Sequence, residues 1–378
     1  MTAARTIVVK IGSSSVTTPS GGVDERTLAK LAAEVAAERT GGRRVVVVTS
    51  GAVAAGWTAL AEDAERPGDL ATLQAVSAVG QHHLMRAWSE AFEATGLLVG
   101  QVLLAPLDFV HRGQYLRARR TLERLLELGV VPVVNENDAV ADAELRFGDN
   151  DRLAALVAHL VGADLLVLLT DTAGLFTGDP RTDDGASLIE EVVDIDHRLE
   201  AAAGGPGTAV GSGGMSSKLA AARLAVWSGV EAVIADAARP GVVADAVAER
   251  PGVGTRFRPR GERLAARKLW IAFAVGAEGT LVVDDGARQA LLEHGRSLLL
   301  AGVVGVEGGF GADDAVELAG TDGVVFAKGL ARHGADTVAA WAGRRSSELP
   351  DDLDATIVHR DDLVILPERE ATAVGPEE

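Results

Sequence analysis

The sequence predicts an α/β protein: a three-layer α/β/α sandwich with a mostly parallel sheet, followed by a small, mainly β, barrel-like domain. In the first two thirds of the chain, short β-branched runs alternate with Ala-rich amphipathic stretches. Strands that alternate with helices indicate βαβ units. The runs are apolar throughout, which is typical of parallel strands buried on both faces. After about residue 260, short runs separated by Gly/Asp turns replace this pattern.

The first part of the chain contains four strand-like runs, each followed by a polar turn. These runs are Thr6–Val9, Val45–Val48, Val130–Val134 and Leu165–Leu169. The helices expected around them are Asp24–Arg39, Leu70–Ala94, Tyr115–Leu128 and Asn150–Val161. Open α/β sheets bind ligands at the carboxyl ends of their strands. The turns that follow the four runs are therefore the candidate functional positions.

The last part of the chain reads as a separate, mainly β domain. Its expected strands are Thr280–Val283, Val303–Gly305, Ala315–Leu318, Gly323–Ala327 and Ala355–Val358, and its expected helices are Gly286–Glu293 and Asp336–Ala342. A charged stretch with Pro and Gly, Arg256–Arg267, is typical of a linker. We therefore expect one domain over residues 1–260, a linker over 261–278, a second domain over 279–367 and a frayed acidic tail over 368–378.

The composition excludes several classes of protein. The chain has 378 residues, of which 47% are hydrophobic, so two domains can each bury a core. It has no cysteine, which excludes disulfides and thiol catalysis. A net charge of −18 argues against general affinity for nucleic acid or anionic membranes. The longest apolar runs fall short of the roughly 18–20 residues of a membrane span, so we expect a cytoplasmic protein.

Two turns near the N-terminus suit anions. In Lys10-Ile11-Gly12-Ser13, a lysine at a strand end precedes a Gly/Ser turn whose N–H groups can face the same phosphate. The alternative is an ordinary surface lysine. In Thr49-Ser50-Gly51-Ala52, the turn presents N–H groups at the start of a helix. The alternative is a simple serine N-cap.

Short polar and acidic residues concentrate in two neighbouring segments, Asn135–Asp138 and Gly148–Asp151. Asn and Asp side chains supply the acceptors and donors that the ammonium and carboxylate of an amino acid require. The alternative is a pair of Asx turns with a helix N-cap. An acidic cluster also suits a divalent metal, but the Asp-x-Asp-x-Asp-Gly calcium pattern is absent. A further alternative is that the carboxylates hold the lysines in place.

Two later turns complete the set. Thr170-Asp171-Thr172-Ala173-Gly174 follows a strand and suits ribose or adenine. The segment Gly211–Lys218 is a glycine-rich loop that enters a helix with a lysine in its first turn, so N–H groups and an ammonium meet at a helix N-terminus. It does not have the Walker spacing. The alternative is a flexible linker that caps the helix.

Together these segments resemble the amino-acid kinase family. The matching motifs are Val-Lys-Ile-Gly-Ser, Val-Thr-Ser-Gly-Ala-Val-Ala-Ala-Gly, Val-Pro-Val-Val-Asn-Glu-Asn-Asp, Phe-Gly-Asp-Asn-Asp, Leu-Leu-Thr-Asp and Gly-Ser-Gly-Gly-Met-Ser-Ser-Lys, in this order. Within the family, the Asn-Glu-Asn-Asp and Phe-Gly-Asp-Asn-Asp pair resembles the branch that phosphorylates glutamate. The C-terminal part resembles a PUA domain through Phe326-Ala327-Lys328-Gly329 and the stretch from Gly286 to Leu299.

The resemblance implies a role for each matching position. Lys10 and Lys218 would stabilise the phosphoryl group in transfer, and Asp151, with Asp149 beside it, would orient the lysines or the magnesium shell. The residues that would hold glutamate are Ser50, Gly51, Asp138 and Asn150. The residues that would hold ATP are Lys10, Gly12, Thr170, Asp171, Ser212, Gly213, Gly214, Met215, Ser216, Ser217 and Lys218.

The resemblance also implies an activity and partners. We expect ATP-dependent phosphorylation of the γ-carboxylate of L-glutamate, the first step of proline biosynthesis, with Mg²⁺ accompanying ATP and no dedicated protein metal ligand. Inhibition by proline, a homo-oligomer (dimer or tetramer) and transfer of the product to glutamyl-phosphate reductase are further expectations from the family.

Three alternatives stay open. The first is a sister kinase acting on N-acetylglutamate, aspartate or a nucleotide monophosphate. The second is an RNA-binding protein that uses the PUA domain. Over residues 279–378, however, acidic side chains outnumber basic ones by more than two to one. Proteins that bind RNA usually present a basic surface, so this composition argues against RNA binding. The third is a non-catalytic amino-acid sensor.

Overall fold

The chain folds as two compact units, Met1–Leu264 and Ala265–Glu378. The computed structural model describes residues 5–18, 21–60, 69–140, 150–178, 185–193, 199, 214–259, 266–273, 275–350 and 353–370. Within these ranges, none of the helices combines the length and the apolar character that a membrane crossing needs.

The first unit is built on an eight-stranded sheet with the order β3-β4-β2-β1-β5-β7-β8-β6. Its strands are β1 (Thr6–Ile11), β2 (Arg44–Val48), β3 (Val99–Leu104), β4 (Val131–Glu136), β5 (Leu165–Thr170), β6 (Glu191–Val192), β7 (Glu231–Asp236) and β8 (Thr255–Phe257). Every neighbouring pair is parallel except β7 and β8. The mostly parallel sheet predicted from the sequence is confirmed.

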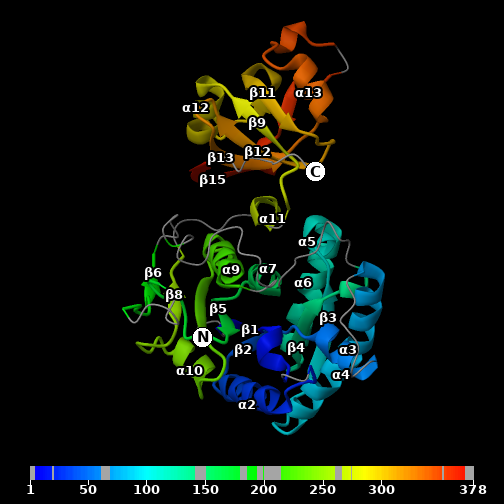
Figure 1. The fold of residues 1–378 in the computed structure, drawn as a ribbon, viewed down its shortest axis with the longest axis vertical. Helices are drawn as coiled ribbons and strands as arrows, with labels where there is room; N and C mark the ends of the chain where they lie inside the picture. The colour runs from blue at the N-terminus through cyan, green and yellow to red at the C-terminus, as the bar shows by residue number, and fades with distance from the viewer. Residues whose placement is uncertain are drawn as a thin grey trace. The chain divides into compact units, whose positions relative to one another are not determined.

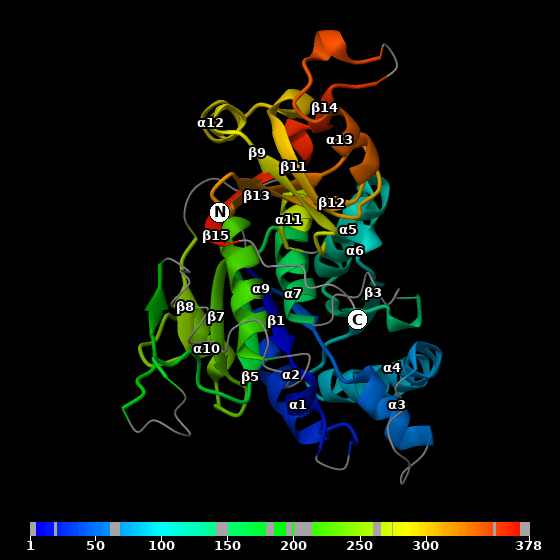
Figure 2. The same cartoon turned by 45° about the horizontal axis from the view of Figure 1, so that its top comes forward.

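Helices cover both faces of this sheet, which gives the three layers (Figures 1 and 2). They are α1 (Ser13–Val16), α2 (Glu25–Thr40), α3 (Ala52–Leu60), α4 (Leu70–Glu93), α5 (Leu107–Val110), α6 (Arg112–Glu127), the 3-10 turn η1 (Asp138–Val140), α7 (Asn150–Leu160), α9 (Met215–Trp227) and α10 (Val242–Val247). One layer consists of α2, α4 and α10, whose apolar side chains share a core with Ile7, Val9 and Ile11 of β1. The opposite face carries α6, α7 and α9, which contact β4, β1 and β7 respectively.

The register of the sheet brings the polar turns together. Lys10 of β1 is in register with Val48 of β2 on one side and with Leu168 of β5 on the other. Val48 is in turn in register with Val134 of β4. Because these four strands run parallel, the turns that follow them lie along one edge of the sheet.

The second unit is rich in β structure, as predicted. Its strands are β9 (Gly279–Val283), β10 (Leu298–Leu299), β11 (Val303–Gly308), β12 (Ala315–Gly320), β13 (Val324–Leu330), β14 (Thr356–Val358) and β15 (Leu363–Glu370). Its helices are α11 (Ala266–Phe273), α12 (Asp285–His294) and α13 (Ala335–Trp341), with the 3-10 turns η2 (Leu300–Gly302), η3 (Ser346–Glu348) and η4 (Arg360–Asp362). One sheet has the order β11-β9-β12-β13-β15, and β10 pairs with β14 in a separate ribbon. These strands enclose their own apolar core.

Two boundaries of this unit differ from the prediction. Part of the segment expected to be a linker is the helix α11, in which Leu269 and Ile271 are buried and which contacts β13 and β15. The charged residues around this short apolar group hid the helix from sequence analysis. The expected tail also begins too early, because β15 continues to Glu370, which is in register with Val324 of β13. Residues 371–378 lie outside the described ranges.

Candidate active site

Three charged side chains that are far apart in the sequence meet at the carboxyl edge of the first sheet. They are Lys10 near the end of β1, Asp151 in the first turn of α7 and Lys218 in the first turn of α9. Lys218 Nζ donates to Asp151 Oδ2 over 3.1 Å, and Lys10 Nζ contacts the other oxygen, Oδ1. Exposed fractions are 2% for Lys10, 0% for Asp151 and 5% for Lys218. We name these three residues the lysine–aspartate cluster.

The charges of this cluster favour an anion. Two ammonium groups and one carboxylate leave one formal positive charge in excess, and burial weakens the screening of that charge by water. The lysine–aspartate cluster by itself is therefore positive, although the chain has a net charge of −18. Such a centre is suited to a phosphate or to a transition state that gains negative charge.

The sequence explains why these side chains converge. Successive residues of a strand face opposite sides of the sheet. Ile7, Val9 and Ile11 belong to the core shared with α2 and α4, so Lys10 lies on the side of α7 and α9. These two helices lie side by side, as both views show (Figures 1 and 2). Their buried alanines, among them Ala154 in α7 and Ala222 in α9, permit close packing that places their N-terminal turns next to each other.

Glycines and serines surround the lysine–aspartate cluster. A Cβ atom on Gly12 would lie 3.6 Å from Lys10 Nζ, so the backbone after β1 passes directly beside the ammonium. Ser217 Oγ lies 3.2 Å from Asp151 Oδ2 and donates to the carbonyl of Gly214, the N-cap of α9, over 2.8 Å. Met215 and Ser216 form the start of the same helix. Asp149, Ser212 and Gly213, also expected here, lie outside the described residues.

Three side-chain amides form a network next to this cluster. Asn150 Nδ2 donates to the carbonyl of Thr49 at 2.7 Å, to Ser50 Oγ at 2.8 Å and to Asn135 Oδ1 at 2.8 Å. Asn135 Nδ2 donates to Gln81 Oε1 at 2.8 Å. We name Gln81, Asn135 and Asn150 the amide network. Because Asn150 directly precedes Asp151, the network adjoins the lysine–aspartate cluster.

Gly51 shapes the turn that presents Ser50 to the amide network. Its φ angle is +102°, a conformation that residues with a Cβ atom rarely adopt. A Cβ at this position would also lie 2.8 Å from Val16 Cγ2. The turn after β2 therefore requires glycine for two independent reasons.

Asp138 is held from the side of α4. Ser77 Oγ donates to Asp138 Oδ2 over 2.8 Å, and Ser77 is only 3% exposed. Ser77 and Gln81 are four residues apart on α4, so they lie on the same face of the helix. This face of α4 thus contacts both Asp138 and the amide network.

Thr170 and Asp171 lie at the end of β5, the neighbour of β1 in the sheet. Thr170 Oγ1 donates to Asp171 Oδ1 over 3.1 Å, and Asp171 is exposed. The structure places both residues on the same edge of the sheet as the lysine–aspartate cluster. None of their described hydrogen bonds reaches the lysine–aspartate cluster.

Across the part of the chain that the structure describes, no group of three or more His, Cys, Asp or Glu side chains is arranged to hold a metal ion. The two oxygens of the buried Asp151 carboxylate contact the ammonium groups of Lys10 and Lys218, one each.

Comparison with known proteins decides the family. The amino acid kinase family model matches residues 5–236, and the PUA domain model matches residues 279–353. The chain belongs to the amino acid kinase family. A protein named glutamate 5-kinase from Nocardia farcinica is 48% identical over 96% of this chain and 97% of the relative. Proteins with the same name are 48% identical in Citrifermentans bemidjiense, over 95% and 97%, and in Myxococcus xanthus, over 96% and 97%.

These matches confirm the family and the fold class that the sequence predicted. The amino acid kinase match covers most of the first unit, and the PUA match covers most of the second. Among solved structures, carbamate kinase from Giardia lamblia bound to AMP-PNP can be superposed on this chain with a TM-score of 0.49. The sequence identity is 16%, and the match covers 68% of this chain and 99% of that chain.

Three buried polar residues beside the lysine–aspartate cluster were not predicted from the sequence as parts of the site: Ser77, Gln81 and Asn135. Asn135 is part of the Asn-Glu-Asn-Asp motif, but no role was assigned to it. Ser77 and Gln81 are polar positions four residues apart on a face of α4 that also buries Val76, Leu84 and Trp88. Polar residues at this spacing inside an apolar stripe are the signal that could have identified them.

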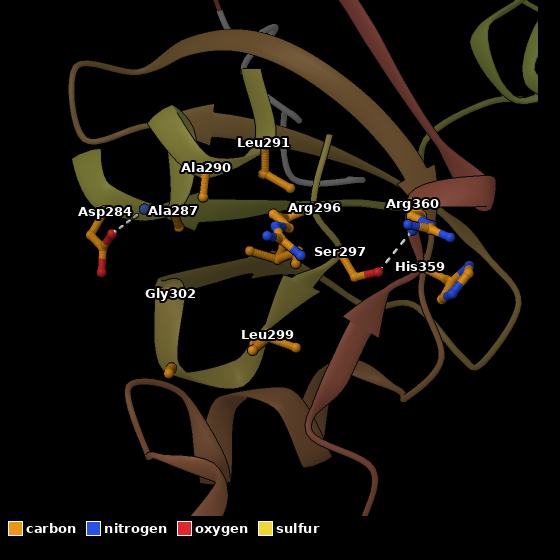
Figure 3. Close-up of a pocket in the computed structure, with 12 residues that line it drawn as sticks. Asp284, Ala287, Ala290, Leu291, Arg296, Ser297, Leu299, Gly302, His359 and Arg360 are labelled. Carbon is orange, nitrogen blue, oxygen red and sulfur yellow. Dashed lines mark hydrogen bonds between the residues drawn. The ribbon is translucent and has the colours of Figure 1, made fainter. Parts of the chain in front are cut away.

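The PUA unit contains a pocket of about 620 Å³ (Figure 3). Its lining includes the apolar side chains of Leu291 and Leu298 and the basic side chains of Arg296 and Arg360. The backbone N–H of Arg360 donates to Ser297 Oγ over 3.0 Å (Figure 3). None of the site residues predicted from the sequence lines this pocket.

Proposed function

We propose that this chain transfers the γ-phosphoryl group of ATP to the γ-carboxylate of L-glutamate, giving L-glutamyl 5-phosphate, the first step of proline biosynthesis. The chain is a carboxyl-group phosphotransferase of the glutamate 5-kinase type, aligned with its relatives over nearly its whole length. The observation that carries the proposed chemistry is the buried Asp151 carboxylate with an amine of Lys10 on one oxygen and of Lys218 on the other.

The mechanism follows from charge. The γ-carboxylate is already an anion near pH 7, so it attacks the γ-phosphorus without a general base. The enzyme must instead align two anions that repel each other and compensate charge on the equatorial phosphoryl oxygens. In our proposal Lys10 and Lys218 provide this compensation, and Asp151 fixes the position of both ammonium groups.

The neighbouring polar residues would hold the substrates. We assign glutamate to Ser50, Gly51, Asp138 and Asn150, where the carboxylate of Asp138 suits the α-ammonium group. We assign the nucleotide to Gly12, Thr170, Asp171 and the start of α9, whose N-terminal N–H groups suit phosphate oxygens. The residues outside the described ranges, Asp149, Ser212 and Gly213, keep the roles implied by the family.

We propose that Mg²⁺ enters with the phosphates of ATP. Bound there, it would neutralise part of the phosphate charge and orient the γ-phosphoryl group. The contacts of Asp151 favour a role in orienting the lysines over a role as a magnesium ligand.

Further proposals rest on the glutamate 5-kinase relatives. Proline would inhibit at or beside the glutamate site, and proline inhibition that is relieved by raising glutamate would support this.

We also propose a homo-oligomer, a dimer or tetramer. The acyl phosphate product hydrolyses readily, which favours its transfer to glutamyl-phosphate reductase. ATP and free glutamate are both cytoplasmic metabolites, and we place the reaction in that compartment.

The function is tested by ADP release from Mg-ATP with glutamate, N-acetylglutamate, aspartate and UMP in parallel, with hydroxylamine added to trap the acyl phosphate. ADP release and a trapped hydroxamate with glutamate alone are expected. Turnover of another acceptor in place of glutamate would change the substrate assignment. Glutamate binding without ADP release would favour an amino-acid sensor.

A further inference from the structure

Two buried polar atoms of the amide network lack a hydrogen-bond partner among the described residues. They are Gln81 Nε2, a donor, and Asn150 Oδ1, an acceptor. Gln81 is only 8% exposed, so its amide is largely shielded from bulk water. A buried polar group without a partner costs free energy, so each such group calls for a specific partner, and a bound ligand can supply one.

The orientation of the Gln81 amide follows from its neighbours. Asn135 Oδ1 accepts from the backbone N–H of Glu136 over 2.9 Å and from Asn150 Nδ2 over 2.8 Å, so this atom is the oxygen. The other end of the Asn135 amide is then the donor, and the Gln81 atom that it contacts at 2.8 Å must be the oxygen Oε1. The NH₂ group of Gln81 therefore points away from Asn135.

The side chains of the proposed glutamate site supply more acceptors than donors. The two hydrogens of Asn150 Nδ2 are shared among three protein acceptors, which leaves Asn150 only its oxygen for a ligand. Asp138 also offers a carboxylate, and both oxygens suit the α-ammonium group of an amino acid. The α-carboxylate needs donors instead. Among the side chains assigned to glutamate, only the Ser50 hydroxyl can donate.

We infer that Gln81 Nε2 donates a hydrogen bond to the α-carboxylate of the amino-acid substrate. This inference rests on the proposed function and adds a substrate-binding residue to it. Ser77, which holds Asp138, lies one turn before Gln81 on α4, and side chains at this spacing are about 5–6 Å apart at Cβ. The side chain that holds the acceptor for the ammonium, Ser77, and the donor for the carboxylate, Gln81, thus come from positions one helical turn apart on α4. The two substrate groups, the ammonium and the α-carboxylate, are attached to a single carbon atom.

The test replaces Gln81 by methionine, which keeps the length and volume of the side chain and removes the donor. We expect KM for glutamate to rise about ten- to hundredfold, the effect of losing a hydrogen bond to a charged group. KM for ATP and the melting temperature should stay near the wild-type values. Gln101→Met, an exposed glutamine on β3, is the matched control and should leave both KM values unchanged.

A second substrate separates binding from a general structural effect. 4-Aminobutyrate keeps the γ-carboxylate and the ammonium group but lacks the α-carboxylate. If Gln81 binds the α-carboxylate, Gln81→Met lowers kcat/KM for glutamate and leaves that for 4-aminobutyrate nearly unchanged. Equal losses for both substrates, or a rise in KM for ATP with a lower melting temperature, would overturn the inference in favour of a structural role.

The outcomes also separate this inference from the proposed function. Glutamate turnover by the wild type with an unchanged glutamate KM in Gln81→Met would overturn the inference alone. Absence of glutamate turnover in the wild type would overturn both.

If Gln81→Met does not fold, Gln81→Glu serves instead, because it retains an acceptor for Asn135 and places a negative charge against the substrate carboxylate. A glutamate KM within twofold of wild type in Gln81→Glu would equally overturn the inference.

Discussion

Lys218 Nζ lies 3.1 Å from Asp151 Oδ2, although the two residues are 67 positions apart in the sequence. The second oxygen of the same carboxylate contacts Lys10. One buried carboxylate thus separates two ammonium groups that would otherwise repel each other in a region of weak screening. Asp151 is therefore the residue on which the geometry of both lysines depends.

Replacing Asp151 by asparagine should test this dependence, because the amide keeps the shape and removes the charge. We expect kcat to fall at least about a hundredfold as the lysines lose their fixed positions. Two buried ammonium groups would then lack their counter-charge, so the free energy of unfolding should fall by about 3 kcal/mol. Steady-state ADP release and urea unfolding measure the two effects.

The control for this variant is Glu123→Gln, which removes an exposed carboxylate paired with Arg119 on α6. It should change neither kcat nor the free energy of unfolding appreciably. Activity of Asp151→Asn close to that of the wild type would contradict the proposed role of Asp151.

Removing either lysine should reduce the rate of phosphoryl transfer directly. We expect Lys10→Ala and Lys218→Ala each to lower kcat by at least roughly a hundredfold, the scale of losing one preorganised donor that stabilises developing charge. Lys30→Ala is the matched control, because Lys30 pairs with Glu34 on α2 and has no assigned role. Single-turnover measurements at saturating ATP would isolate the chemical step, and a rate near that of wild type in either variant would contradict the mechanism.

The sequence was sufficient for the parts of the fold that carry strong local signals. The apolar runs at β1, β2, β4 and β5 and the polar turns after them predicted the site edge, because parallel strands align their ends. By contrast, β3 (Val99–Leu104) contains Gly100 and Gln101, and its mixed polarity weakens the strand pattern.

The contacts within the site were beyond sequence reasoning for a different reason. Two roles for Asp151 were left open, orienting the lysines or the magnesium shell, and only the three-dimensional structure places its two oxygens on two amines. Gln81 is 54 positions away from Asn135, and no local pattern links a helical glutamine to a strand-end asparagine. Such pairs arise from the packing of α4 against the sheet, which depends on long-range contacts.

The approach of α3 to α4 should be sensitive to side-chain volume. A Cβ atom on Gly80 would lie 1.7 Å from the carbonyl oxygen of Ala52, and one on Gly56 would lie 1.9 Å from that of Val76. Gly80→Ala therefore forces the helices apart, and we expect the free energy of unfolding to fall by about 2 kcal/mol or more. Because α4 carries Ser77 and Gln81, KM for glutamate should rise as well.

Gly113→Ala on α6 is the matched control for this helical glycine, since a Cβ there would have only an ordinary contact of 3.6 Å with Arg117. It should be neutral or slightly stabilising, as expected for alanine in a helix. An unchanged glutamate KM in a folded Gly80→Ala protein would show that the position of α4 does not affect the substrate site.

Removal of the PUA unit should leave the chemistry in place. Every residue assigned to catalysis or substrate binding precedes residue 219, and the apolar clusters of the two units have no residues in common. We therefore expect a chain that ends at Leu264 to fold and to release ADP with glutamate. Circular dichroism and the coupled ADP assay measure both properties. The same truncation carrying Lys218→Ala should be inactive, which would show that the remaining activity comes from the lysine–aspartate cluster. A folded but inactive truncation would instead assign the PUA unit a part in catalysis, because loss of folding could then not explain the result.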